Sequence, residues 1–98
     1  MQRDTVLELL RSHRADLERL GAKSLALFGS TARNEATPRS DVDLLVEFAR
    51  PVGLFEFIDL QNYLEELLQS RVDLGTPASM RPRLRERVLK EAVYVSRS

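Results

Sequence analysis

The chain has 98 residues, of which 43% are hydrophobic and 31% charged, the composition of an ordinary globular domain. Fifteen basic and fifteen acidic residues cancel, and this balance excludes a general nucleic-acid binder, whose affinity would come from a basic surface. The absence of cysteine excludes disulfides, thiolate catalysis and zinc–thiolate sites. We find neither a signal peptide nor a membrane-spanning stretch, and we expect one cytoplasmic domain over residues 1–98.

The N-terminal part of the chain predicts a helix followed by a buried strand. Five residues from Val6 to Leu20 recur at helical spacing, and Gly21 is suited to a left-handed cap at the end of that helix. Residues 24–28 form a short apolar run that is typical of a buried strand. His13, the only histidine, lies on the same helical face, and we interpret it as a packing or boundary residue.

The remainder of the chain alternates between short helices and strands. We expect a brief helix over 30–36 capped by Ser30, a turn at 37–40, a strand over 41–48, a turn at 51–53, a helix over 54–69, a strand over 71–75 and a helix near 81–93. Alternating elements of this kind predict an α/β domain in which helices flank a small sheet.

Two carboxylates at the start of the second strand give the main functional signal. Asp41 and Asp43 are two residues apart, so in a strand both side chains project from one face while Val42 points to the other. Carboxylates this close repel each other unless a cation lies between them, and Mg²⁺ prefers such hard oxygen ligands. The Asp-x-Asp pattern alone is also typical of a solvated strand edge or a turn.

The Gly29-Ser30 turn gives the acidic pair its context. It follows a buried strand and precedes a short helix, where backbone N–H groups favour anions and glycine lets a phosphate approach the main chain. The segment GSTARN is not a Walker A loop, because it lacks the G-K-[ST] ending. A phosphate-binding turn after one strand and a metal-binding pair at the next would place a triphosphate and its Mg²⁺ on one side of a sheet.

Asp73 is the third acidic candidate. It lies in the last predicted strand between apolar neighbours, and a carboxylate there needs a partner because burying an unpaired charge is costly. That partner is either an arginine, Arg71 or Arg39, or a metal ion shared with the other two carboxylates. Three carboxylates can hold two metal ions, one activating an attacking hydroxyl and one neutralising the leaving phosphates.

The stretch GSTARNEATPRSDVDLLVEF resembles the signature of the DNA polymerase β-like nucleotidyltransferase superfamily. It is more similar still to the minimal nucleotidyltransferases of prokaryotes, and Asp73, between a valine and a leucine, matches their third acidic position. Asn34 stands where the family usually has glycine, and asparagine tolerates a left-handed backbone. The other matching positions are Gly29, Ser30, Ala32, Arg33, Glu35, Ala36, Ser40, Asp41, Asp43, Leu44 and Leu45.

The resemblance implies a nucleotidyltransferase fold, with a small mixed sheet, and a reaction in which an acceptor hydroxyl attacks the α-phosphate of a nucleoside triphosphate. ATP would be the donor, and two Mg²⁺ ions would be bound. The catalytic and metal-binding residues would be Asp41, Asp43 and Asp73. The nucleotide contacts would be Gly29, Ser30, Arg33 and Ser40.

The resemblance also implies a partner. Minimal nucleotidyltransferases are often encoded beside a HEPN-domain ribonuclease and act as the antitoxin of the pair, in studied families by adding AMP to a tyrosine of the toxin. A HEPN toxin would therefore be both partner and acceptor here. The sequence leaves a second function open, a non-catalytic module of the same fold that neutralises its partner by occlusion, although the presence of all three carboxylates disfavours it.

Two further features remain without an assigned role. Arginines at alternate positions of the last helix, Arg81, Arg83, Arg85 and Arg87, form either a solvated face or a partner-docking surface. Phe55, Phe57 and Tyr63 lie in a helix dominated by core spacing, and one or two of them could be exposed for docking.

Overall fold

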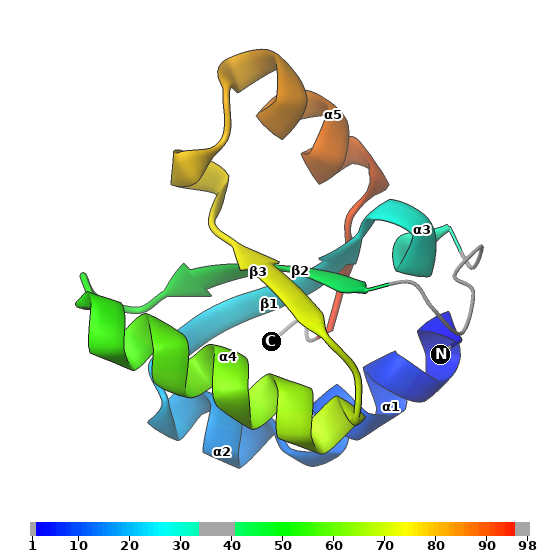
Figure 1. The fold of residues 1–98 in the computed structure, drawn as a ribbon. Coiled ribbons are helices and arrows are strands. Elements are labelled where there is room, and N and C mark those ends of the chain that lie inside the picture. The colour runs from blue at the N-terminus through cyan, green and yellow to red at the C-terminus, as the bar shows by residue number, and fades with distance from the viewer. Residues whose placement is uncertain (1, 34–40, 96–98) are drawn as a thin grey trace.

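The chain forms a mixed four-stranded sheet with helices on both faces (Figure 1). A small sheet flanked by helices is confirmed, although the sequence predicted only three of the four strands. The structure is a computed structural model that describes residues 2–33 and 41–95. In chain order the elements are α1 (Arg3–Ser12), α2 (Arg14–Arg19), β1 (Ala22–Phe28), α3 (Gly29–Ala32), β2 (Val42–Phe48), α4 (Leu54–Leu68), β3 (Val72–Gly75), the 3-10 helix η1 (Pro77–Ser79), α5 (Pro82–Glu91) and β4 (Val93–Tyr94).

The sheet order is β3-β2-β1-β4. The antiparallel pair β1–β2 forms its centre, with Leu27 opposite Leu44. The helix α4 connects β2 to β3, which are parallel, and their pairing places Asp43 directly beside Asp73. The short strand β4 adds to the free edge of β1 in antiparallel orientation.

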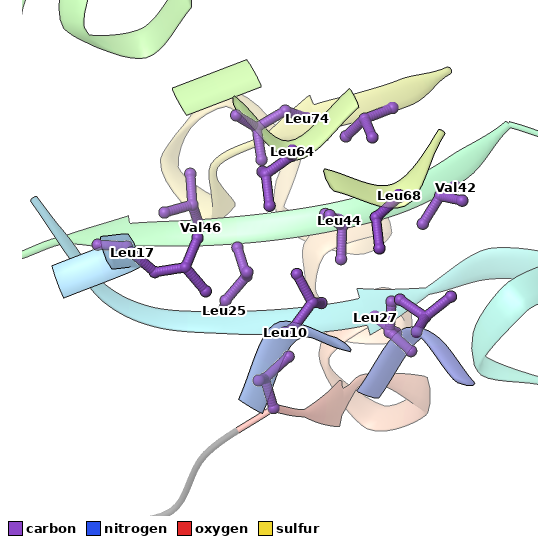
Figure 2. Packing of buried hydrophobic residues seen from close by; sticks show 14 of the residues in the cluster. Leu10, Leu17, Leu25, Leu27, Val42, Leu44, Val46, Leu64, Leu68 and Leu74 are labelled. Carbon is purple, nitrogen blue, oxygen red and sulfur yellow. The ribbon is translucent and has the colours of Figure 1, made fainter. Parts of the chain in front are cut away.

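The hydrophobic core lies between one face of the sheet and the helices α1, α2 and α4. In β2, Val42, Leu44 and Val46 alternate toward this core, as expected for a strand with one buried face. Figure 2 shows Leu44 and Val46 beside Leu64 of α4, with Leu10 of α1 approaching from the β1 side. The fully buried leucines are Leu10, Leu27, Leu44, Leu60, Leu64 and Leu68.

The opposite face of the sheet is covered differently. The intervening residues of β2 and β3, Asp43 and Asp73 among them, project to this face, where η1 and α5 lie (Figure 1). Helix α5 buries only one residue, Val88, although a surface helix usually buries a whole apolar stripe. The two faces therefore have separate roles, because one holds the core and the other carries the acidic side chains.

The N-terminal helix differs from the prediction, because it is divided in two at His13. The ring nitrogen Nδ1 of His13 lies 2.9 Å from the carbonyl oxygen of Leu9, so this histidine is a boundary residue, as predicted. Gly21 has φ of +96° and supplies the left-handed turn expected before β1. No helix in the described ranges is long and apolar enough to cross a membrane.

Two other predicted boundaries are wrong. The helix α3 begins at Gly29, so Ser30 lies within its first turn and does not cap it; residues 34–36 of the predicted helix and the turn at 37–40 lie outside the described residues. The last helix ends at Glu91, and Val93–Tyr94 pairs with β1. The sequence V-Y-V at 93–95 has the β-branched and aromatic composition that favours a strand.

The core position Leu64 provides a test of this packing. Leu64→Ala removes a side chain with no exposed surface and leaves a cavity, so we expect a loss of about 2–5 kcal/mol in the free energy of unfolding. Leu54→Ala, on the same helix but 70% exposed, should cost about 0.5 kcal/mol or less. Urea denaturation measures both, and equal losses would contradict the described burial of α4.

Candidate active site

The centre of the site is the pair Asp43 and Asp73, which are neighbours in the parallel register of β2 and β3. The pairing begins where the Val42 N–H donates a 2.9 Å hydrogen bond to the Arg71 carbonyl oxygen. Both carboxylates project from the same face, Asp43 half-buried and Asp73 exposed. Two acidic side chains on neighbouring strands repel each other, so a cation between them is favourable.

The electrostatics of the pair show how strongly the carboxylates interact. The pKa of Asp43 is raised from its ordinary value of 3.8 to about 6, first by burial and then by the negative charges of Asp73 and Asp41. A hydrogen bond with Asp73 adds to this rise in pKa, and the positive charge of Arg33 partly offsets it. Near neutral pH, a proton or a cation is therefore needed to relieve the repulsion.

The Gly29-Ser30 turn lies against this pair. Gly29 has φ of +67°, and a Cβ atom added to it would overlap the Oδ2 atom of Asp43. Glycine is therefore required at this position both for its backbone angle and for the close approach. This contact places the start of α3 directly against Asp43, on the same side as Asp73.

Arg33 extends the turn toward α5. Its backbone N–H donates to the Gly29 carbonyl oxygen at 3.2 Å, which closes the single turn of α3. Its guanidinium lies 3.3 Å from a carboxylate oxygen of Glu91, the last residue of α5. Glu91 was not found by sequence reasoning, because no spacing pattern connects residues so far apart along the chain.

The structure brings together most of the residues that the sequence indicated. Gly29, Asp43 and Asp73 meet, and Asp41 is close enough to raise the pKa of Asp43. Asp41 is exposed and lies one residue before β2, so the strand predicted over 41–48 begins at Val42. Ser30 follows Gly29 within α3, whereas Ser40, a predicted nucleotide contact, lies outside the described residues, as does Arg39.

The carboxylates fit Mg²⁺ as part of a site. Within residues 2–33 and 41–95, no three acidic or histidine side chains are close enough to form a complete metal centre. Mg²⁺ is commonly held by one or two carboxylates together with substrate phosphates and water, and Asp43 and Asp73 supply that number of ligands. Asp73 forms no ion pair with Arg71 in the described part of the chain, so that alternative partner is not observed.

The comparison with known families agrees with this geometry. Residues 10–95 match the family model described as a nucleotidyltransferase domain, so the chain belongs to the nucleotidyltransferase family. The family match and the fold together define a nucleotidyltransferase enzyme similar to the minimal nucleotidyltransferases. The expected fold and enzyme class are therefore confirmed.

Three similar proteins belong to more specific classes of nucleotidyltransferase. The chain is 42% identical over 93 residues to the protein adenylyltransferase MntA of Thermococcus cleftensis, with 94% of each chain covered. A Methanocaldococcus jannaschii protein, provisionally assigned as a protein adenylyltransferase, is 40% identical over 92 residues, covering 92% of this chain and 94% of its own. The solved structure of a minimal nucleotidyltransferase superposes with a TM-score of 0.83 at 40% identity, covering 95% of both chains.

A more distant solved structure has the same fold. It is a toxin–antitoxin with AMP-PNP, and it aligns with a TM-score of 0.70 at 22% identity. The alignment covers all of this chain and 75% of the other.

Replacement of Gly29 tests the close approach. Gly29→Ala introduces a Cβ at a positive φ and against a carboxylate oxygen, so we expect a destabilisation of about 1–2 kcal/mol or more. Gly21→Ala is the matched control, because its Cβ would meet only ordinary van der Waals neighbours at the same sign of φ. Thermal unfolding of both variants isolates the contribution of the overlap with Asp43, and equal losses would refute it.

The raised pKa of Asp43 predicts a pH-dependent effect on stability. Because the folded state favours the protonated carboxyl, the stability that this group contributes is present below about pH 4 and is lost as the pH rises through about 6. Asp43→Asn mimics the neutral form, so in a metal chelator at pH 8 we expect it to be more stable than the wild type by about 1 kcal/mol, after allowance for solvent screening. The gain should disappear at pH 4, and a less stable variant at pH 8 would contradict the described repulsion.

Proposed function

We propose that this nucleotidyltransferase transfers AMP from ATP to a hydroxyl group of a protein. The observation that carries the proposal is the contact of the Gly29 turn with Asp43, beside Asp73. It supports the proposal because a glycine turn at a helix start is suited to a phosphate and a pair of carboxylates is suited to a cation. The name of the Thermococcus cleftensis relative, a protein adenylyltransferase, supports protein as the acceptor class.

The chain's own groups have separate tasks in the proposed reaction. The Gly29 turn and Ser30 bind the terminal phosphates through backbone N–H groups and a hydroxyl, and Arg33 adds positive charge. Asp43 and Asp73 would hold Mg²⁺, and the resemblance alone adds Asp41 as a ligand and a second ion. The metal would supply charge neutralisation of the phosphates and activation of the acceptor. We assign Ser40 to the nucleotide as well, on the resemblance alone.

The chemical step exchanges the phosphoanhydride bond between the α- and β-phosphates of ATP for a phosphoester bond to the acceptor. The acceptor oxygen forms a bond to the α-phosphorus, while the bond from that phosphorus to the bridging oxygen breaks and pyrophosphate leaves with its electron pair. The acceptor's proton passes to a carboxylate of the acidic group, for which we assign Asp73, the more exposed member of the pair. Asp43, which lies against Gly29, orients the donor.

The proposed acceptor is a tyrosine of a HEPN-domain toxin, and the chain is the antitoxin of that pair. One solved structure that aligns with this chain is a complex of a tri-AMPylated Shewanella oneidensis HEPN toxin with its MNT antitoxin. The alignment has a TM-score of 0.66 at 21% identity. That level of identity establishes only a shared fold. We extend the toxin partner of that complex to this chain as part of the proposal. We place the reaction in the cytoplasm, where ATP is available.

Loss of either carboxylate should abolish transfer. The assay contains ATP labelled on the α-phosphate, Mg²⁺ and the cognate toxin. We expect Asp43→Asn and Asp73→Asn each to lower the initial rate of transfer at least about 1000-fold. Excess chelator should lower the rate of the wild type to the same extent. Asp59→Asn, an exposed aspartate on α4, is the control and should retain the full rate. A rate within about tenfold of wild type in both site variants would sink the assignment.

Calorimetry with Mg-ATP separates catalysis from simple occlusion. We expect the wild-type chain to bind Mg-ATP, and Asp43→Asn to bind it more weakly. A wild-type chain that suppresses the toxin without binding nucleotide would replace this proposal with the non-catalytic binding module.

A further inference from the structure

The strand β3 lies at an edge of the sheet, so only one of its sides pairs with another strand. The Val42 N–H donates to the Arg71 carbonyl oxygen, and β2 therefore pairs with the residues on either side of Val72. The N–H and carbonyl groups of Val72 consequently point away from the sheet. They need other partners, because a buried backbone group without a hydrogen bond is costly.

Two side chains of α4 supply these partners. The side-chain amide of Gln61 donates to the Val72 carbonyl oxygen at 3.2 Å. The Val72 N–H donates to the Oε2 atom of Glu65 at 3.0 Å. Gln61 and Glu65 are four residues apart and so lie on the same face of the helix. We call these two residues the α4 clamp, since together they bind both backbone groups of one strand residue, as a neighbouring strand would.

Glu65 occupies a position that the helix alone does not favour. It lies in the last turn of α4, which ends at Leu68 (Figure 1). A negative charge there is unfavourable, because it lies beside the negative end of the helix dipole. The hydrogen bond from the Val72 N–H offsets this cost, since a bond to a charged acceptor is stronger than one between neutral groups. A glutamate at this position therefore stabilises β3 and not α4.

The residue held by the α4 clamp is the neighbour of Asp73 in the chain. Val72 is buried in the core, and Asp73 projects to the opposite face of the sheet, beside Asp43. Because the two residues share one strand backbone, a shift or rotation at Val72 moves the Asp73 carboxylate with it. The pairing with β2 restrains β3 on its inner side, and the α4 clamp restrains it on its outer side.

We propose that the two residues of the α4 clamp are positioning residues of the active site, which keep the Asp73 carboxylate beside Asp43. The inference rests on the proposed function, in which Asp73 receives the proton of the acceptor and Asp43, against Gly29, orients the donor. Loss of the α4 clamp therefore slows the chemical step, whereas binding of Mg-ATP is nearly unchanged.

Steady-state transfer to the cognate toxin tests this separation of effects. Glu65→Met and Gln61→Met each remove one hydrogen bond to Val72 and keep a side chain of similar length. We expect each to lower kcat about 10-fold or more, with the KM for Mg-ATP within about twofold of wild type. Thermal unfolding shows that each variant is folded at the assay temperature.

Two controls separate positioning from a general loss of stability. Glu65→Gln keeps an acceptor oxygen for the Val72 N–H, so its kcat should stay within about threefold of wild type. Tyr63→Phe removes a different hydrogen bond of α4, the 3.1 Å bond from the Tyr63 hydroxyl to Asp16. Its destabilisation should resemble that of the methionine variants, whereas its kcat should equal that of the wild type.

Amide hydrogen exchange measures the α4 clamp without any enzyme assay. We expect the Val72 N–H to exchange at least about 10-fold faster in Glu65→Met than in the wild type, and to be unaffected in Tyr63→Phe. An unchanged exchange rate in Glu65→Met would overturn the inference, because the bond would then not restrain β3.

The kinetic outcomes distinguish this inference from the function on which it rests. A wild type that transfers AMP while both methionine variants keep its kcat would refute the inference alone, as would an equal loss of kcat in Tyr63→Phe. A wild type that transfers no AMP to a protein would refute the proposed function, and the inference with it.

Discussion

The carboxylates of Asp43 and Asp73 are held side by side by the parallel register of β2 and β3, and the rest of the site depends on this enforced repulsion. Burial raises the pKa of Asp43 further, and Gly29 lies so close that a larger residue would overlap its carboxylate. The fold therefore maintains a position at which positive charge is favourable before any ligand arrives. This arrangement costs stability in the unliganded chain, and any cation that binds there would recover that stability.

One strand separates the stabilising and the functional parts of the molecule. Val42, Leu44 and Val46 pack into the core, and Asp43 between them faces away. Because the side-chain period of a strand is two, a shift of one residue would exchange the two sets, burying the carboxylate and exposing the valines. The hydrophobic core thus fixes the register on which the acidic pair depends.

The sequence predicted the parts of this structure that depend on local patterns. The apolar runs indicated β1, β2 and β3, and the glycine and acidic motifs indicated residues that do meet at one place. The features that the sequence did not predict depend on tertiary contacts. The break at His13, the pairing of Val93–Tyr94 with β1 and the ion pair of Arg33 with Glu91 each depend on surroundings that no short window contains.

The crossover from β2 through α4 to β3 has a consequence for how the chain becomes active. Asp43 and Asp73 are distant in sequence and become neighbours only when the parallel pair closes, which is an entropically slow, non-local event. The β1–β2 pair joins residues that are nearer in sequence and can form earlier. A nascent or partly folded chain therefore lacks the acidic pair altogether, and catalytic competence arises late, together with the completed sheet.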